Sequence, residues 1–117
     1  MSNYQKAQWA LRIGVAGEFL GHGLLAIGAK ADWVKWFAVF GVNDVVMATN
    51  ILFWIGVVDV VLAIIVLVKP VKPLLLWMAL WGFWTALLRP IVGAGWLDFV
   101  ERSANFGAPL ALYYLLK

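Results

Sequence analysis

Residues 7–29 of the chain read AQWALRIGVAGEFLGHGLLAIGA. About 20 apolar residues suffice to cross a bilayer as a helix, so this run predicts a membrane span. The run nevertheless carries Arg12, Glu18 and His22. Glu18 and His22 are four residues apart, and they therefore share one face of a helix. Because ionisable groups at membrane depth usually face the protein interior or a water-filled cavity, this face predicts an internal polar site.

The composition indicates an integral membrane protein. Of the 117 residues, 65% are hydrophobic, and the mean hydropathy is +0.92. Soluble domains contain roughly 45–50% apolar residues, so a water-soluble fold could not hide this much apolar surface. The chain has no cysteine, which excludes disulfides, thiol chemistry and iron–sulfur ligation by its own residues. We expect the net charge of +3 to set the topology rather than to bind nucleic acid.

The hydrophobic pattern predicts an all-α membrane protein, a four-transmembrane-helix bundle that forms a single domain over residues 1–117. The expected spans are residues 7–29, 45–68, 73–92 and 98–116. Between the first two spans, residues 32–41 place aromatic side chains at positions i, i+3, i+4 and i+7. This spacing predicts a short amphipathic helix that lies in the membrane interface.

Local signals predict where the helices begin and where they touch. The expected N-caps are Asp32, then Asn43 or Asp44, then Asp98 with Glu101 as its acidic partner. Gly17 and Gly21 are four residues apart, a spacing that predicts close approach of a neighbouring helix. Pro109 should bend the last span, because it removes a backbone hydrogen bond. We expect Arg12 to act as an anchor that reaches the membrane interface.

The distribution of lysines predicts the orientation. Four lysines are expected at one face of the membrane: Lys6, Lys69, Lys72 and Lys117. Cytoplasmic loops carry an excess of basic residues, so we expect both termini to be cytoplasmic, in a bacterial or archaeal inner membrane. We expect the first span to be retained rather than cleaved as a signal, because its apolar run is longer than a signal core and contains Glu18 and His22.

Polar residues from all four expected spans fall at similar depth, given a helical rise of about 1.5 Å per residue. The candidate ligand-binding or proton-relay residues are Glu18, His22, Asp59, Arg89, Arg102 and Asn105. The candidate pocket-lining residues are Trp81, Trp84 and Thr85, for which core packing is the alternative role. The polar groups either form a structural ion network that fixes helix packing or form a site that binds a polar head or relays protons. We assign no catalytic residue and no metal site.

These residues resemble a known family in the first 70 residues of the chain. The sequence LRI at 11–13 followed by EFLGHG at 18–23, the aromatic–glycine connector at 37–42, and Gly56 followed by Asp59 are similar to the DoxX and DoxX-like superfamily of small four-helix membrane proteins. Asp59 stands where the family has glutamate, and Lys30 falls slightly later than the family's lysine. Arg89 and the residues after it match no family pattern.

The resemblance implies an accessory protein or subunit of a membrane redox system linked to quinones. The cofactor is left open, with a quinone as the candidate. The common depth of the polar groups and the indole faces of Trp81 and Trp84 predict a pocket that takes a quinone or lipid head group, and we expect no catalytic activity of the chain's own. Expected partners are the lipid bilayer, and either membrane-complex subunits or further copies of the chain.

Two alternatives stay open at the sequence level. Residues 16–21, AGEFLG, also resemble the first helix of small multidrug resistance transporters, which predicts a proton-coupled small transporter working through Glu18. The remaining helices do not resemble that family, and Arg89 and Arg102 would repel cationic substrates. The other alternative is a structural subunit of a larger membrane complex, in which tryptophans and small residues make the intersubunit contacts.

Overall fold

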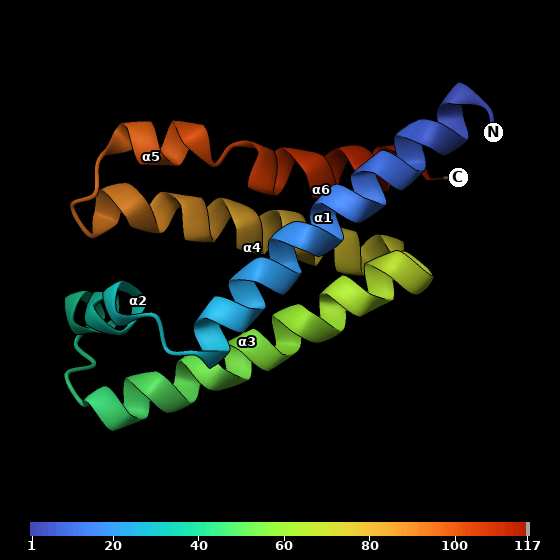
Figure 1. Cartoon of the computed structure of the whole chain (residues 1–117). Coiled ribbons are helices and arrows are strands. Elements are labelled where there is room, and N and C mark those ends of the chain that lie inside the picture. The colour runs from blue at the N-terminus through green and yellow to red at the C-terminus, as the bar shows by residue number, and fades with distance from the viewer. Residues whose placement is uncertain (117) are drawn as a thin grey trace.

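The computed structural model describes residues 1–116, and all its regular structure in that range is helical (Figure 1). In chain order the elements are α1 (Asn3–Ile27), α2 (Ala31–Trp36), the 3-10 helix η1 (Phe37–Phe40), α3 (Val45–Val68), α4 (Lys72–Ile91), α5 (Trp96–Glu101) and α6 (Ala104–Leu115). Three of these helices, α1, α3 and α4, are long and apolar enough to cross a membrane. The expected class, an all-α integral membrane protein, is therefore confirmed. Lys117, which entered the orientation argument, lies outside the described residues.

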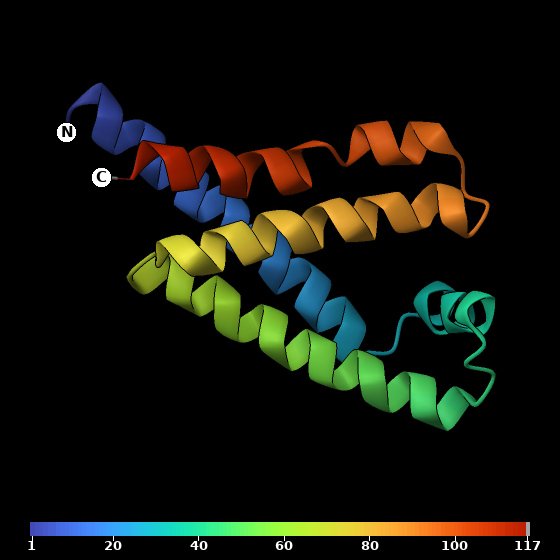
Figure 2. The same cartoon turned by 180° about the vertical axis from the view of Figure 1, so that it is seen from behind.

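The helices run lengthwise, and their connections gather at two ends. Figures 1 and 2 show the start of α1, the α3–α4 turn and the end of α6 at one end, which we call the terminal end. The α2–η1 segment and the α4–α5 turn lie at the other end, which we call the far end. From their shared turn at the terminal end, α3 and α4 diverge toward the far end in both views.

Helices α1 and α3 pack as an antiparallel pair around two glycines. A Cβ atom added to Gly56 would lie 2.5 Å from the Gly23 carbonyl oxygen and 2.9 Å from the Ile27 amide nitrogen. A Cβ atom added to Gly23 would lie 2.8 Å from the Gly56 carbonyl oxygen. No real side chain sits at such distances, so the two backbones touch only because both positions are glycine.

The predicted contact through Gly17 and Gly21 is wrong. Both glycines are exposed, and an added Cβ atom would meet nothing within 4 Å at either position. The face of α1 that packs in the bundle carries Ala16 and Gly23 instead. Several faces of α1 carry small residues, so their spacing alone could not identify the face that meets α3.

The expected last span over residues 98–116 is not one continuous helix, because the structure divides it into α5 and α6. The amides of Arg102 and Ser103 donate to carbonyls only three residues back, and the Ser103 hydroxyl donates to the Val100 carbonyl. These short-range bonds replace the helical pattern and interrupt the helix. Pro109 has no N–H group, so it cannot donate a hydrogen bond to the Asn105 carbonyl. This carbonyl packs against Gly82 of α4, and a Cβ atom added to Gly82 would lie 2.2 Å from the Asn105 carbonyl oxygen.

One of the three predicted N-caps is confirmed. The side chain of Asp44 accepts hydrogen bonds from the amides of Val46 and Met47 at the start of α3. Asp32 and Asp98 lie inside their helices, whose N-caps are Lys30 and Gly95. Gly95 has φ of +102°, a conformation that L-residues rarely adopt, and as the N-cap of α5 it lies three residues before the predicted cap, Asp98.

Arg12 is turned inward onto the end of α3 rather than outward as a surface anchor. It is buried, its Nε donates to the Val66 carbonyl at 3.1 Å, and its Nη2 donates to the Leu67 carbonyl. Its guanidinium carbon lies 3.8 Å from the centre of the Trp9 ring. The last carbonyls of a helix have no partner within the helix, so Arg12 caps the C-terminal end of α3 from α1.

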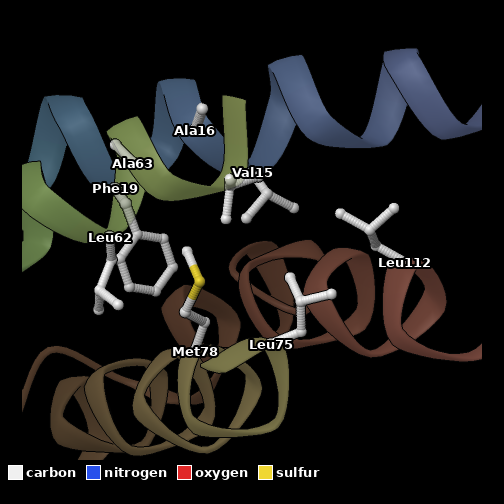
Figure 3. Close-up of a cluster of buried hydrophobic side chains, with 9 residues drawn as sticks. Val15, Ala16, Phe19, Leu62, Ala63, Leu75, Met78 and Leu112 are labelled. Carbon is white, nitrogen blue, oxygen red and sulfur yellow. The ribbon is translucent and has the colours of Figure 1, made fainter. Parts of the chain in front are cut away.

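The hydrophobic core lies toward the terminal end. Figure 3 shows Phe19, Leu62, Met78 and Leu112 converging from α1, α3, α4 and α6. Much of the outer surface is also apolar, with exposed large side chains such as Leu24, Phe53 and Leu80. In a bilayer these outer side chains face lipid, so the same hydrophobic composition serves both the core and the membrane surface.

Gly56→Ala should destabilise the protein by about 1–3 kcal/mol, because the new methyl group would overlap backbone atoms of α1 that cannot move aside. The measurement is reversible unfolding of the purified protein in mixed detergent micelles, followed by tryptophan fluorescence. Gly17→Ala is the matched control, since its methyl group enters open space. Equal effects of the two substitutions would contradict the close approach of α1 and α3.

Candidate functional site

A cavity of about 310 Å³ lies between α1, α3 and α4 on the far-end side of the core. This volume is at the lower end of the roughly 300–1,000 Å³ that is common for small-molecule sites. Its lining includes six of the nine residues predicted for the site: His22, Asp59, Trp81, Trp84, Thr85 and Arg89. The structure thus brings side chains from three helices, far apart in sequence, to one cavity.

Core and cavity occupy successive levels of the same helices. Each of the three long helices contributes one stretch to the core and a neighbouring stretch, nearer the far end, to the cavity. The core stretches are 15–19 of α1, 62–66 of α3 and 75–78 of α4. The cavity stretches are 22–26 of α1, 52–59 of α3 and 81–89 of α4. The helices are close enough at the first level for Phe19 and Met78 to fill the interior (Figure 3). Where α3 and α4 diverge, side chains no longer fill the space, and the cavity opens.

Arg89 is held in place within the cavity wall. It is 4% exposed, its Nη1 donates to the Thr85 carbonyl at 2.9 Å, and its guanidinium carbon lies 4.6 Å from the centre of the Trp36 ring. An arginine side chain has five N–H donors, so most of them remain available. No side-chain nitrogen or oxygen in the described residues is sealed in the interior without a hydrogen-bond partner. The free donors of Arg89 therefore open onto the cavity.

Asp59 supplies an acceptor from the opposite helix. It is 5% exposed and lines the cavity, and within residues 1–116 its carboxyl group has neither a hydrogen-bond nor an ion-pair partner. Because no unpartnered oxygen is sealed away, these oxygens also open onto the cavity. A buried polar group without a hydrogen-bond partner costs free energy, so a ligand that enters the cavity and hydrogen-bonds to this carboxyl group would remove that cost.

The α2–η1 segment, residues 31–40, covers the cavity, and we call it the cover segment. Its aromatic side chains that line the space are Trp33, Trp36, Phe37 and Phe40. The Trp33 ring lies 5.7 Å from the ring of His22, and the Phe40 ring lies 6.1 Å from the ring of Trp84, centre to centre. The cover segment is thus attached to α1 and α4 through aromatic contacts.

The role of the cover segment was missed at the sequence level, although its signal was visible. The periodicity of Trp33, Trp36, Phe37 and Phe40 predicts one apolar face, and these four side chains do line one space. The expectation placed this face in the lipid interface, whereas the structure turns it onto the cavity. An amphipathic pattern identifies which face is apolar, but it does not identify what that face contacts.

The other three predicted residues, Glu18, Arg102 and Asn105, do not line the cavity. Glu18 is half-buried on α1 and lies close enough to Asp59 and Arg102 to interact with both charges. Arg102 is also within electrostatic range of His22 and Arg89. No two oppositely charged side chains of residues 1–116 approach within ion-pair distance in this group, so its charges interact without direct pairing.

No family model, curated protein or solved structure matches the sequence. The site is therefore interpreted from its own chemistry. It combines donors on Arg89, an acceptor on Asp59, ring nitrogens on His22 and the indole faces of several tryptophans in one small space. Within residues 1–116, no group of three or more histidine or carboxylate side chains is placed to hold a metal ion. The arrangement is suited to bind a flat molecule that carries polar atoms at its edges.

Trp36→Ala should loosen the cover segment, because it removes the ring against which Arg89 packs. A cation–π contact contributes about 1 kcal/mol, so amide hydrogen exchange across residues 31–40 should rise roughly fivefold while exchange in α1 stays unchanged. Mass spectrometry of peptides from the detergent-solubilised protein measures both. Trp54→Ala, which removes an exposed ring on α3, is the control. If both variants exchange alike in the cover segment, the Trp36 contact does not hold it.

Proposed function

We propose that this chain is a small membrane protein of the DoxX-like type that binds a quinone-class ligand in the cavity beneath the cover segment. It would act as an accessory protein or subunit of a membrane redox system. The observation that carries the proposal is the cavity of about 310 Å³, which is lined by a buried arginine from α4, a buried aspartate from α3 and several aromatic side chains.

The chemistry of the cavity wall supports a flat ring as the ligand. Trp36, Trp81 and Trp84 supply aromatic surface, and aromatic pairs gain about 0.5–1.5 kcal/mol beyond simple burial. Arg89 offers N–H donors that suit a ring oxygen. A quinone has such a ring and such oxygens, and its apolar tail would be accepted by the surrounding bilayer. A phospholipid head group has no ring to use these walls.

The topology that accompanies this proposal has four crossings. We propose that α5 and α6 together form a fourth, interrupted span, since α6 alone has 12 residues and extends about 18 Å, short of a hydrocarbon core of about 30 Å. Both α5 and α6 pack against α4, so one side of the break between them is covered by protein. Irregular backbone at membrane depth is tolerated where protein covers it. We propose further that the terminal end, with Lys6, Lys69 and Lys72, faces the cytoplasm.

Proton-coupled transport through Glu18 has less support. Glu18 does not line the cavity, and Arg102 lies close enough to act on it electrostatically, which disfavours a cationic substrate beside it. A purely structural subunit would not need a cavity lined by buried polar groups with unused hydrogen-bonding capacity. The unpartnered groups of the cavity therefore favour ligand binding over both alternatives.

Binding of a water-soluble, tail-less benzoquinone to the full-length protein in detergent should quench tryptophan fluorescence saturably. Arg89→Gln should raise the dissociation constant by about tenfold, equivalent to 1.4 kcal/mol, because a charge-assisted hydrogen bond is lost. Lys35→Gln, which removes an exposed cation from the cover segment without touching the cavity, should leave binding unchanged. Unsaturable quenching that is identical in all three proteins would rule out the proposed site.

A further inference from the structure

We infer that the cavity selects the reduced form of its ligand: a hydroquinone, an aromatic ring with two hydroxyl groups, rather than the corresponding quinone. The inference rests on the proposed function and adds the redox state of the ligand to it. It follows from two polar groups of the cavity wall that have unused hydrogen-bonding capacity: Arg89, which donates, and Asp59, which accepts.

On the α4 side of the cavity, Arg89 supplies hydrogen-bond donors. Arg89 can only donate hydrogen bonds, and one of its N–H groups is already used on the Thr85 carbonyl. Packing against Trp36 and this backbone contact fix the position of the guanidinium group. Any oxygen that meets it must accept. A quinone carbonyl and a hydroquinone hydroxyl both satisfy this requirement, so Arg89 does not distinguish the two forms.

On the α3 side of the cavity, Asp59 supplies hydrogen-bond acceptors, and here the hydroquinone and the quinone differ. An ionised carboxylate can only accept hydrogen bonds, whereas a protonated carboxyl group can also donate one. Asp59 therefore requires a donor from the ligand in its ionised state, and the selection operates in that state. A hydroquinone hydroxyl can donate to Asp59, whereas a quinone carbonyl brings only lone pairs. With a quinone bound, an ionised Asp59 would remain without a partner at a buried position, which costs free energy.

The two groups can bind oxygens at two edges of one ring. Asp59 and Arg89 form no ion pair with each other, although both are at least nine-tenths buried and both line the same cavity. A ligand that lies between them can use both, with one oxygen accepting from Arg89 and the other donating to Asp59. The indole rings of Trp81 and Trp84 provide the flat walls for the ring between these edges.

The experiment compares three probes built on the same ring: a tail-less hydroquinone, its quinone, and the hydroquinone dimethyl ether, which accepts but cannot donate. Equilibrium dialysis of each against the full-length protein in detergent, without oxygen and at a mildly alkaline pH at which Asp59 is ionised, gives the dissociation constants. The hydroquinone should bind at least about tenfold more tightly than the other two, a difference that corresponds to one hydrogen bond to a buried charged group.

Asp59→Asn should bring the constants for hydroquinone and quinone to within about threefold, because an amide offers a donor as well as an acceptor. Asp32→Asn, a change at an exposed carboxyl group of the cover segment, should preserve the selectivity. Equal binding of hydroquinone and quinone by the unchanged protein would overturn this inference and leave the proposed function intact. If none of the probes binds, both are wrong. A circular dichroism spectrum identical to that of the unchanged protein establishes that Asp59→Asn folds.

Discussion

The contact between Gly23 and Gly56 is the constraint on which the rest of the bundle depends. It brings the backbones of α1 and α3 together, and Arg12 adds a second connection by capping the end of α3. A comparable contact, Gly82 against the Asn105 carbonyl, joins α4 to α6. The protein is thus built from two close helix pairs, and the space between the pairs is set by how they meet. Within a bilayer, where apolar surface gains little by leaving lipid, such close packing is a main source of helix association.

The two pairs meet in a well-filled core at the terminal end and separate toward the far end (Figures 2 and 3). The cavity is a direct consequence of this divergence, and the cover segment closes it with aromatic side chains. Asp59 and Arg89 could not be tolerated on the lipid side of their helices, because charged groups at membrane depth are costly. Inside the cavity they retain unused hydrogen-bonding capacity. One geometric feature therefore explains why the polar residues lie where they do and why they are available to a ligand.

Much of this arrangement could be predicted from the sequence, and the parts that could not share a cause. The long spans were predicted closely, at 7–29, 45–68 and 73–92 against Asn3–Ile27, Val45–Val68 and Lys72–Ile91, because apolar runs bounded by polar residues and prolines define them directly. The grouping of His22, Asp59 and Arg89 followed from their depth along those spans. By contrast, the break before α6 depends on hydrogen bonds around Ser103, and the choice of Gly23 over Gly17 depends on which face meets α3. Contacts of this kind are set by neighbours in space, which periodicity along the chain does not reveal.

Locating a flat ligand in the cavity between the two helix pairs is the most direct test of the proposed binding site. Crystals of the full chain soaked with a bromine-substituted hydroquinone would reveal the bromine by anomalous diffraction. Our account predicts one site, between Asp59 and Arg89 and against the indole rings of Trp81 and Trp84. A bromine found only at the outer, lipid-facing surface, or a cavity that stays empty under saturating ligand, would contradict it.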